Sequence, residues 1–175
     1  MKKALLIASV LFIAVVSTAC INNIAVQELN NKAAEYMQKG DYESAVNRLQ
    51  ASLDLDATMY ETYYNLGIAA TNAKKFDLAI ETLENGIKIK PDFANFYYSL
   101  AVAQAEYAED ISEQKESDKS DKEQNLQQEE LKKSAISNAQ KYLEISPNAE
   151  DREDVEEFIK DLNFEEKEQT LVLEG

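Results

Sequence analysis

The sequence predicts an all-α protein in which pairs of helices stack one after another. Its 175 residues include only 4 Gly and 2 Pro, while Ala, Leu, Glu, Lys and Gln, which favour helices, are abundant. The chain also matches itself at an offset of 34 residues, so that Leu29, Tyr63 and Tyr97 align. A repeat of this length is typical of helix pairs that bury their apolar faces only by stacking on their neighbours.

The middle copy of the repeat carries the most complete motif. In order, it reads Tyr63-x2-Leu66-Gly67-x2-Ala70, then Ala79-x3-Leu83, then Pro91. This motif resembles the tetratricopeptide repeat (TPR), in which small residues let two helices cross closely and a proline follows the second helix. The resemblance implies a TPR domain over residues 26–163, with the fold of a right-handed α-solenoid. Its three helix pairs would cover about 26–59, 60–93 and 94–147.

The third copy contains an insertion. The spacing is 12 residues from Gly67 to Ala79 but 34 from Ala101 to Ala135, which leaves 22 extra residues at about 109–130. This stretch is polar and contains neither Gly nor Pro. We expect both helices of the third pair to run long and to meet near residues 117–120; a disordered loop is the alternative.

Local signals mark several helix boundaries. Asp41 is placed to cap one helix, and Thr58 with Glu61 has the spacing of a capping box before another. Beyond the repeats, apolar residues recur at i, i+3, i+4 and i+7 from Val155 to Leu162, which predicts an amphipathic capping helix within residues 148–163. The sequence leaves residues 164–175 undetermined.

The N-terminus has the order of a secretory signal. Lys2 and Lys3 precede an apolar run over residues 4–16, and small residues follow, so we expect residues 1–19 to be a signal peptide. The stretch from Val16 to Cys20 resembles a bacterial lipobox. This resemblance implies lipidation of Cys20 with a diacylglycerol on sulfur and a palmitate-type chain on the amine, followed by a short tether to residue 25.

Two alternatives stay open for this segment: cleavage after Ala19 without lipidation, and an uncleaved membrane anchor. All three place the rest of the chain outside the cytoplasm, because the lysines favour the inner side. The leading expectation is an exported, membrane-anchored lipoprotein. In a two-membrane envelope, Ile21 after the cysteine points to the outer membrane or the cell surface.

Composition excludes several classes of function. The formal charge of −15 repels nucleic acid and anionic lipid headgroups. With one Cys and no His, the chain has no imidazole base, Cys/His zinc site or disulfide framework. We therefore expect no enzyme activity, no cofactor, no metal site and no nucleic-acid partner.

In the TPR family, the first helix of each pair lines a concave groove that binds a peptide or protein segment. Carried over position by position, the groove-facing residues are Asn30, Ala34, Met37 and Gln38; Glu61, Tyr64, Ile68 and Thr71; and Asn95, Tyr98, Val102 and Glu106. Tyr63 and Tyr97 fall at the family's core position, whereas for Tyr64 and Tyr98 both a groove role and a core role are open.

None of these positions is basic, so the groove is not suited to the acidic tails of cytosolic chaperones. A neutral or basic segment of another envelope protein fits better, which predicts a scaffold or adaptor of the cell envelope. The alternative function is a transport accessory that binds a small apolar ligand or docks a solute-binding protein. The sequence leaves the oligomeric state open.

Overall fold

In a computed structural model, the described parts of the chain are residues 23–113 and 121–173, with side chains in the last helix described as far as Asn163. These parts form seven helices and no strand, which confirms the predicted all-α class. The first helix covers residues 23–38. The others are α2 (Tyr42–Leu55), α3 (Tyr60–Asn72), α4 (Phe76–Ile89), α5 (Ala94–Glu113), α6 (Asp121–Ile145) and α7 (Arg152–Leu173).

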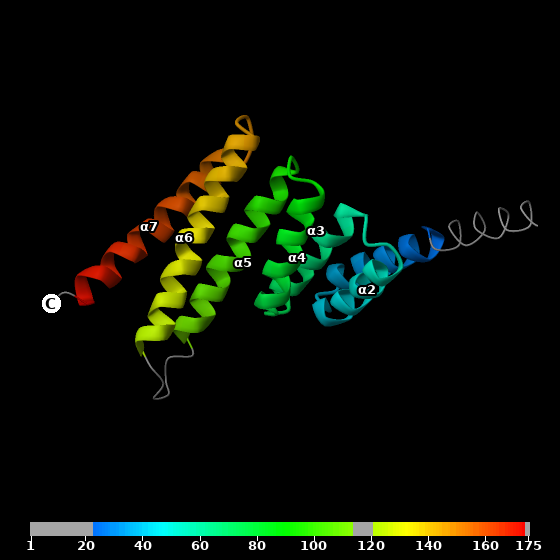
Figure 1. Cartoon of the computed structure of the whole chain (residues 1–175), viewed down its shortest axis with the longest axis horizontal. Helices are drawn as coiled ribbons and strands as arrows, with labels where there is room; N and C mark the ends of the chain where they lie inside the picture. Colours follow the sequence, from blue (N-terminus) through cyan, green and yellow to red (C-terminus); the bar gives the residue numbers. More distant parts are fainter. Residues whose placement is uncertain (1–22, 114–120, 174–175) are drawn as a thin grey trace, which may run out of the picture.

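The helices follow one another along the long axis of the molecule, from the first helix and α2 at one end to α7 at the other (Figure 1). Neighbours in sequence pack together, and α3 also contacts α5, which is the first helix of the next pair. Two apolar cores result. One extends from the first helix through α2, α3 and α4 to α5 and includes Leu49, Leu66 and Leu83. The other joins α5, α6 and α7.

Helix starts follow the sequence in one case and not in another. Asp41 caps α2, because its carboxylate accepts a hydrogen bond from the backbone N–H of Ser44 at 3.1 Å. The capping box predicted at Thr58 is wrong, since α3 begins after Met59 without a side-chain cap. Thr58 instead donates its N–H and its hydroxyl to Asp56 Oδ1, at 2.8 and 2.6 Å, so it stabilises the preceding link.

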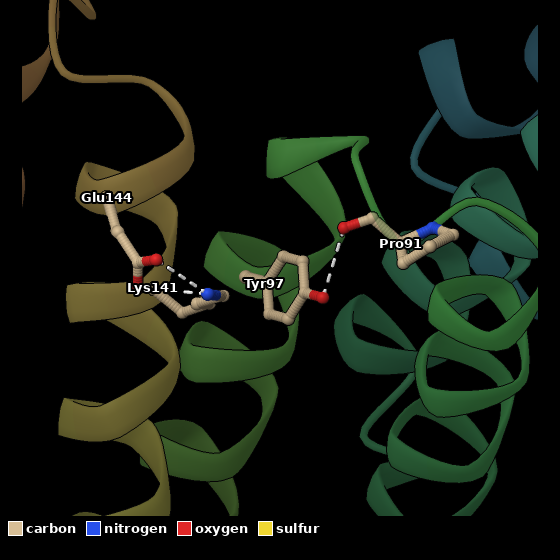
Figure 2. A network of polar contacts seen from close by, with 4 residues as sticks. All are labelled: Pro91, Tyr97, Lys141 and Glu144. Carbon is tan, nitrogen blue, oxygen red and sulfur yellow. Dashed lines mark hydrogen bonds and ion pairs between the residues drawn. The ribbon is translucent and has the colours of Figure 1, made fainter.

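Each link between pairs is held by the helix that follows it. Tyr63 and Tyr97 pack against the two cores as predicted, and their hydroxyls reach back to the link. Arg152, at the start of α7, makes the equivalent contact for the third link. The three hydrogen bonds run from Tyr63 Oη to Ala57 O (3.2 Å), from Tyr97 Oη to Pro91 O (3.1 Å; Figure 2) and from Arg152 Nη1 to Pro147 O (3.1 Å).

Small residues set the closest helix approaches. A Cβ added at Gly67 would overlap the side chain of Leu83, and one added at Gly86 would overlap the ring of Phe96. Because Leu83 and Phe96 are fully buried, neither side chain has free space into which to move. Gly67, which the repeat pattern singled out, and Gly86, which it did not, therefore both have a direct steric role.

The third pair is longer than the second. α5 has 20 residues and α6 has 25, against 13 and 14 in α3 and α4, so most of the polar stretch 109–130 is helical. The expected turn at 117–120 lies outside the described residues. Asn138 Nδ2 on α6 donates to the buried Gln104 Oε1 on α5 at 2.9 Å, which joins the two long helices. The ring of Tyr107 on α5 stacks on that of Phe76 on α4, with centroids 5.2 Å apart. On α6, Lys141 and Glu144 form an exposed ion pair (Figure 2).

The capping helix is longer than the sequence indicates, since α7 runs to Leu173. At the other end, the signal peptide and Cys20 lie outside the described residues, so their roles stay predictions. Among the described helices, none combines the length and the apolar character needed to cross a bilayer.

Candidate functional site

A pocket of about 650 Å³ lies between α5, α6 and α7. All three helices contribute lining side chains, and α6 lies between α5 and α7 (Figure 1). The volume is in the range of pockets that hold a small molecule or a side chain of a partner. The lining residues are Val102, Ala105, Glu106, Glu109 and Ser112 from α5, Gln128 and Lys132 from α6, and Phe158, Asp161 and Leu162 from α7.

The pocket has a buried base and an exposed rim. Leu162, Gln128 and Lys132 are between 2% and 7% exposed, so they form the base. Three exposed side chains form the rim, and all three are acids: Glu106, Glu109 and Asp161. Half-buried apolar side chains lie between rim and base. The arrangement is a partly apolar hollow, with Gln128 and Lys132 at its base and three acidic side chains at its mouth.

The rim is crowded with charge at Glu106. Partial burial raises the pKa of this carboxyl above its usual range, the nearby negative charge of Glu109 adds to the rise, and the ammonium of Lys74 opposes it. Lys74 itself pairs with Asp110, which lies on α5 as Glu106 does; the distance from Lys74 Nζ to Asp110 Oδ1 is 3.4 Å. A cation that entered the mouth would favour the ionised form of Glu106.

Only the third-copy part of the predicted groove reaches this pocket. Val102 and Glu106 line it directly, and Tyr98 lies next to it through a contact between its ring and that of Phe158, with centroids 6.1 Å apart. Of the other predicted residues, the exposed ones are Ala34, Gln38, Glu61 and Asn95, and the half-buried ones are Met37 and Ile68.

Two predicted groove residues use their polar groups inside the stack. Asn30 Nδ2 donates to Ser52 Oγ at 3.2 Å and to Thr62 Oγ1 at 3.1 Å, which joins the first helix to α2 and α3. Thr71 is buried, and its hydroxyl donates to the carbonyl of Gly67 at 3.0 Å. Neither polar group is available to a ligand in this arrangement.

Tyr64 and Tyr98 are half-buried, and each packs against two aromatic rings that follow it in the chain. Tyr64 meets Phe93 and Phe96 edge to face, with centroids 5.2 and 5.8 Å apart. Tyr98 meets Tyr142 at 5.3 Å as well as Phe158. The two tyrosines therefore take part in helix packing, and only part of each ring faces outward.

Sequence reasoning missed the half of the pocket that α6 and α7 supply. The sequence predicts Phe158 and Leu162 as part of the apolar stripe of a cap and assigns no role to Asp161. Gln128 falls in the polar insertion, where nothing in the local pattern marks it as buried. The available signal was the phase of the cap helix, which places Asp161 beside the stripe that faces α5.

The side chains that line this pocket can bind a ligand. Within the described parts of the chain, no group of three or more Cys, Asp or Glu side chains is placed to hold a metal ion. Carboxylates around an apolar hollow attract a ligand that combines a positive group with an aliphatic or aromatic stem.

Comparison with known proteins agrees with this architecture. A family model described as tetratricopeptide repeat matches residues 36–105. No curated protein matches the chain in sequence. Among solved structures, the Arabidopsis OM64 TPR domain is similar, with 15% identity and a TM-score of 0.61 over 80% of this chain and 98% of that one.

Two further similar structures contain a bound peptide. The second TPR domain of human RPAP3, in complex with the HSP70 peptide SGPTIEEVD, has 12% identity and a TM-score of 0.60 over 79% of this chain and 98% of that one. The Yersinia enterocolitica type III secretion chaperone SycD, in complex with a peptide of the translocator YopD, has 19% identity and a TM-score of 0.59 over 82% and 93%. At these identities the likeness shows a shared fold.

Proposed function

Because residues 36–105 make this chain a tetratricopeptide repeat protein, we propose that it is a non-enzymatic binding module that holds a segment of another protein along the first helices of its pairs. The observation that carries the proposal is the pocket between α5, α6 and α7, which lies where predicted groove residues Val102 and Glu106 meet the cap. Peptide complexes of similar TPR structures support the same use of the fold.

The partner segment is neutral or basic. The HSP70 peptide in the RPAP3 complex ends in the acidic sequence EEVD. In this chain the mouth of the pocket presents Glu106, Glu109 and Asp161, and a partner carboxylate there would be repelled. The chain therefore selects a different class of segment from that peptide.

Site-specific crosslinking in intact cells tests this proposal. A photoreactive amino acid replaces the exposed Asn95 at the start of α5, and a matched variant carries it at the exposed Asn47 on α2. We expect a discrete crosslinked partner from position 95 and none from position 47, because only the former faces the predicted groove. Identical crosslinks from both positions, or none from either, would contradict the proposal.

The module acts at the bacterial cell envelope, as a lipoprotein that scaffolds or connects other envelope proteins. The signal-like N-terminus and Cys20 support this part of the proposal. Mass spectrometry of the mature N-terminus should find a lipid-modified Cys20, and Cys20→Ala should leave the membrane fraction while keeping the circular dichroism of the folded domain. A Cys20→Ala protein that stays membrane-bound would refute the anchor.

The second candidate, a transport accessory for a small ligand, draws on the apolar lining of the same pocket. Native mass spectrometry of the purified chain distinguishes the two, because a carried ligand would remain bound as a discrete added mass. The carboxylate rim favours the protein-segment function over a purely apolar cargo.

A further inference from the structure

We propose that the pocket between α5, α6 and α7 receives a lysine or arginine side chain of the bound segment. The inference rests on the proposed function and specifies which part of the partner the site recognises. The occupant is a side chain presented by a protein, and its charged head lies among Glu106, Glu109 and Asp161 at the mouth.

The apolar part of the pocket fits the stem of such a side chain. Val102 and Ala105 on α5, with Phe158 and Leu162 on α7, supply the apolar part of the lining. Lysine and arginine lay their methylene stems on apolar surface while the charged head stays near water. A glutamate or aspartate has a shorter stem and the wrong charge for this mouth.

Charge complementarity decides the sign of the head group. The lining contains three carboxylates and one ammonium, that of Lys132, which lies in the buried base. The three acids lie at the exposed rim, where an incoming head would meet them first. Partial burial raises the pKa of Glu106, and the negative charge of Glu109 adds to the rise. A guanidinium or ammonium placed there relieves this repulsion.

The test uses nuclear magnetic resonance on the full chain solubilised in a nonionic detergent. The probes are N-acetyl methylamides of lysine, arginine, norleucine and glutamate, which differ in the side chain alone. We expect the lysine and arginine probes to shift the Val102 methyl and Phe158 ring signals saturably, and to do so less as salt is raised. Absence of saturable shifts with both cationic probes, or equal binding of norleucine, would overturn the proposal.

Variants of the rim give the second measurement. The triple change Glu106→Gln, Glu109→Gln and Asp161→Asn should weaken lysine binding about tenfold or more, because it removes the charged partners. A control with the same loss of charge is Asp77→Asn, Glu84→Gln and Glu130→Gln, all exposed and outside the pocket lining, and it should bind as the parent does. If the rim triple loses its dispersed spectrum, Glu106→Gln alone serves. Unchanged binding by a folded rim variant would refute the proposal.

The two proposals fail separately. If a partner crosslinks at position 95 equally well in the parent and in the rim triple, the proposed binding function stands. The proposal that the pocket receives a lysine or arginine side chain is then refuted. If the lysine probe binds saturably but no partner is crosslinked, the proposed pocket chemistry stands. The proposal that the chain binds a protein segment is then refuted.

Discussion

At the scale of single residues, one position shows how the three copies differ. Ser52, Gly86 and Tyr142 occupy equivalent places in the second helix of each pair, once the 22-residue insertion is counted. Ser52 bonds to Asn30, Gly86 leaves room for Phe96, and Tyr142 fills its space with its own ring. The same repeat position thus carries a polar side chain, no side chain or an aromatic ring, and the residues that pack against it differ accordingly.

Gly86→Ala tests the steric role of this site. The new Cβ would overlap the fully buried ring of Phe96, so we expect a net loss of about 1–2 kcal/mol in the free energy of unfolding, after the gain in helix propensity. Urea unfolding followed by circular dichroism measures it. In a Phe96→Leu background the same change should cost less, and an equal cost in both backgrounds would place the strain elsewhere.

Tyr142 gives the fold a dependence on alkaline pH. Burial raises the pKa of Tyr142 to about 12, and the hydrogen bond that its hydroxyl donates to Asp151 Oδ1 at 2.6 Å adds to the shift. Because the folded pKa is above the unfolded value of about 10, the protonated form stabilises the fold fully below pH 10. We expect this stabilisation to be lost as the pH rises from about 10 to about 12.

Two measurements check the tyrosine. A ¹³C-tyrosine spectrum should show one ring that titrates near pH 12 and vanishes in Tyr142→Phe. The unfolding free energy of Tyr142→Phe should be about 1 kcal/mol lower at neutral pH and should fall less steeply between pH 10 and 12. A Tyr142 ring that titrates at its ordinary value would contradict the structure.

At the scale of elements, the joint between the first helix, α2 and α3 is held by polar groups. Asn30 binds Ser52 and Thr62, whose side chains are fully buried. The equivalent joint one pair later contains Tyr64, Gly86 and Phe96 and is apolar. A hydrogen-bonded joint depends on every member being present.

Removal of one member should therefore cost more than replacement of the whole set. Asn30→Ala should lower the unfolding free energy by about 1–3 kcal/mol, because the buried hydroxyls of Ser52 and Thr62 lose a partner. Combining Asn30→Leu with Ser52→Ala and Thr62→Val should recover much of that loss. A triple variant that is less stable than Asn30→Ala would argue against this account. Chemical denaturation of both variants decides.

The repeat predicted the pairs better than it predicted the joints. Tyr63, Gly67 and Leu83 lie where the 34-residue pattern puts them, because Gly67 and Leu83 meet within one helix pair and Tyr63 packs against the same core. The pocket follows no such rule. Its walls come from α5 and α7, and the angle between these helices depends on long-range packing around Tyr142 and the extended α6.

At the scale of the whole molecule, α7 both closes the stack and builds one wall of the candidate site. Val155 and Leu162 are buried against α5 and α6, while Phe158 and Asp161 face the pocket. The candidate site is therefore complete only when the cap is docked. Stability of the C-terminal joint and affinity for a partner are expected to change together.

Two Leu→Ala changes of the same size test the packing of α7 on which this coupling depends. Leu162→Ala should lower the unfolding free energy by about 2–5 kcal/mol, because the side chain is only 7% exposed. Leu126→Ala, at a side chain 52% exposed, should change it by no more than about 0.5 kcal/mol. Thermal and urea unfolding compare them directly. Similar losses in both variants would mean that α7 does not pack as described.

The different chemistry of the joints also bears on assembly between molecules. Uniform repeat arrays can exchange units, since any copy fits against any other. Here an exchanged pair would set the ring of Phe96 against the side chain of Tyr142, or leave the hydroxyl of Thr62 facing an apolar neighbour. Because the contacts differ from joint to joint, they determine the order of the helix pairs. Mismatched domain swapping between two molecules is therefore disfavoured.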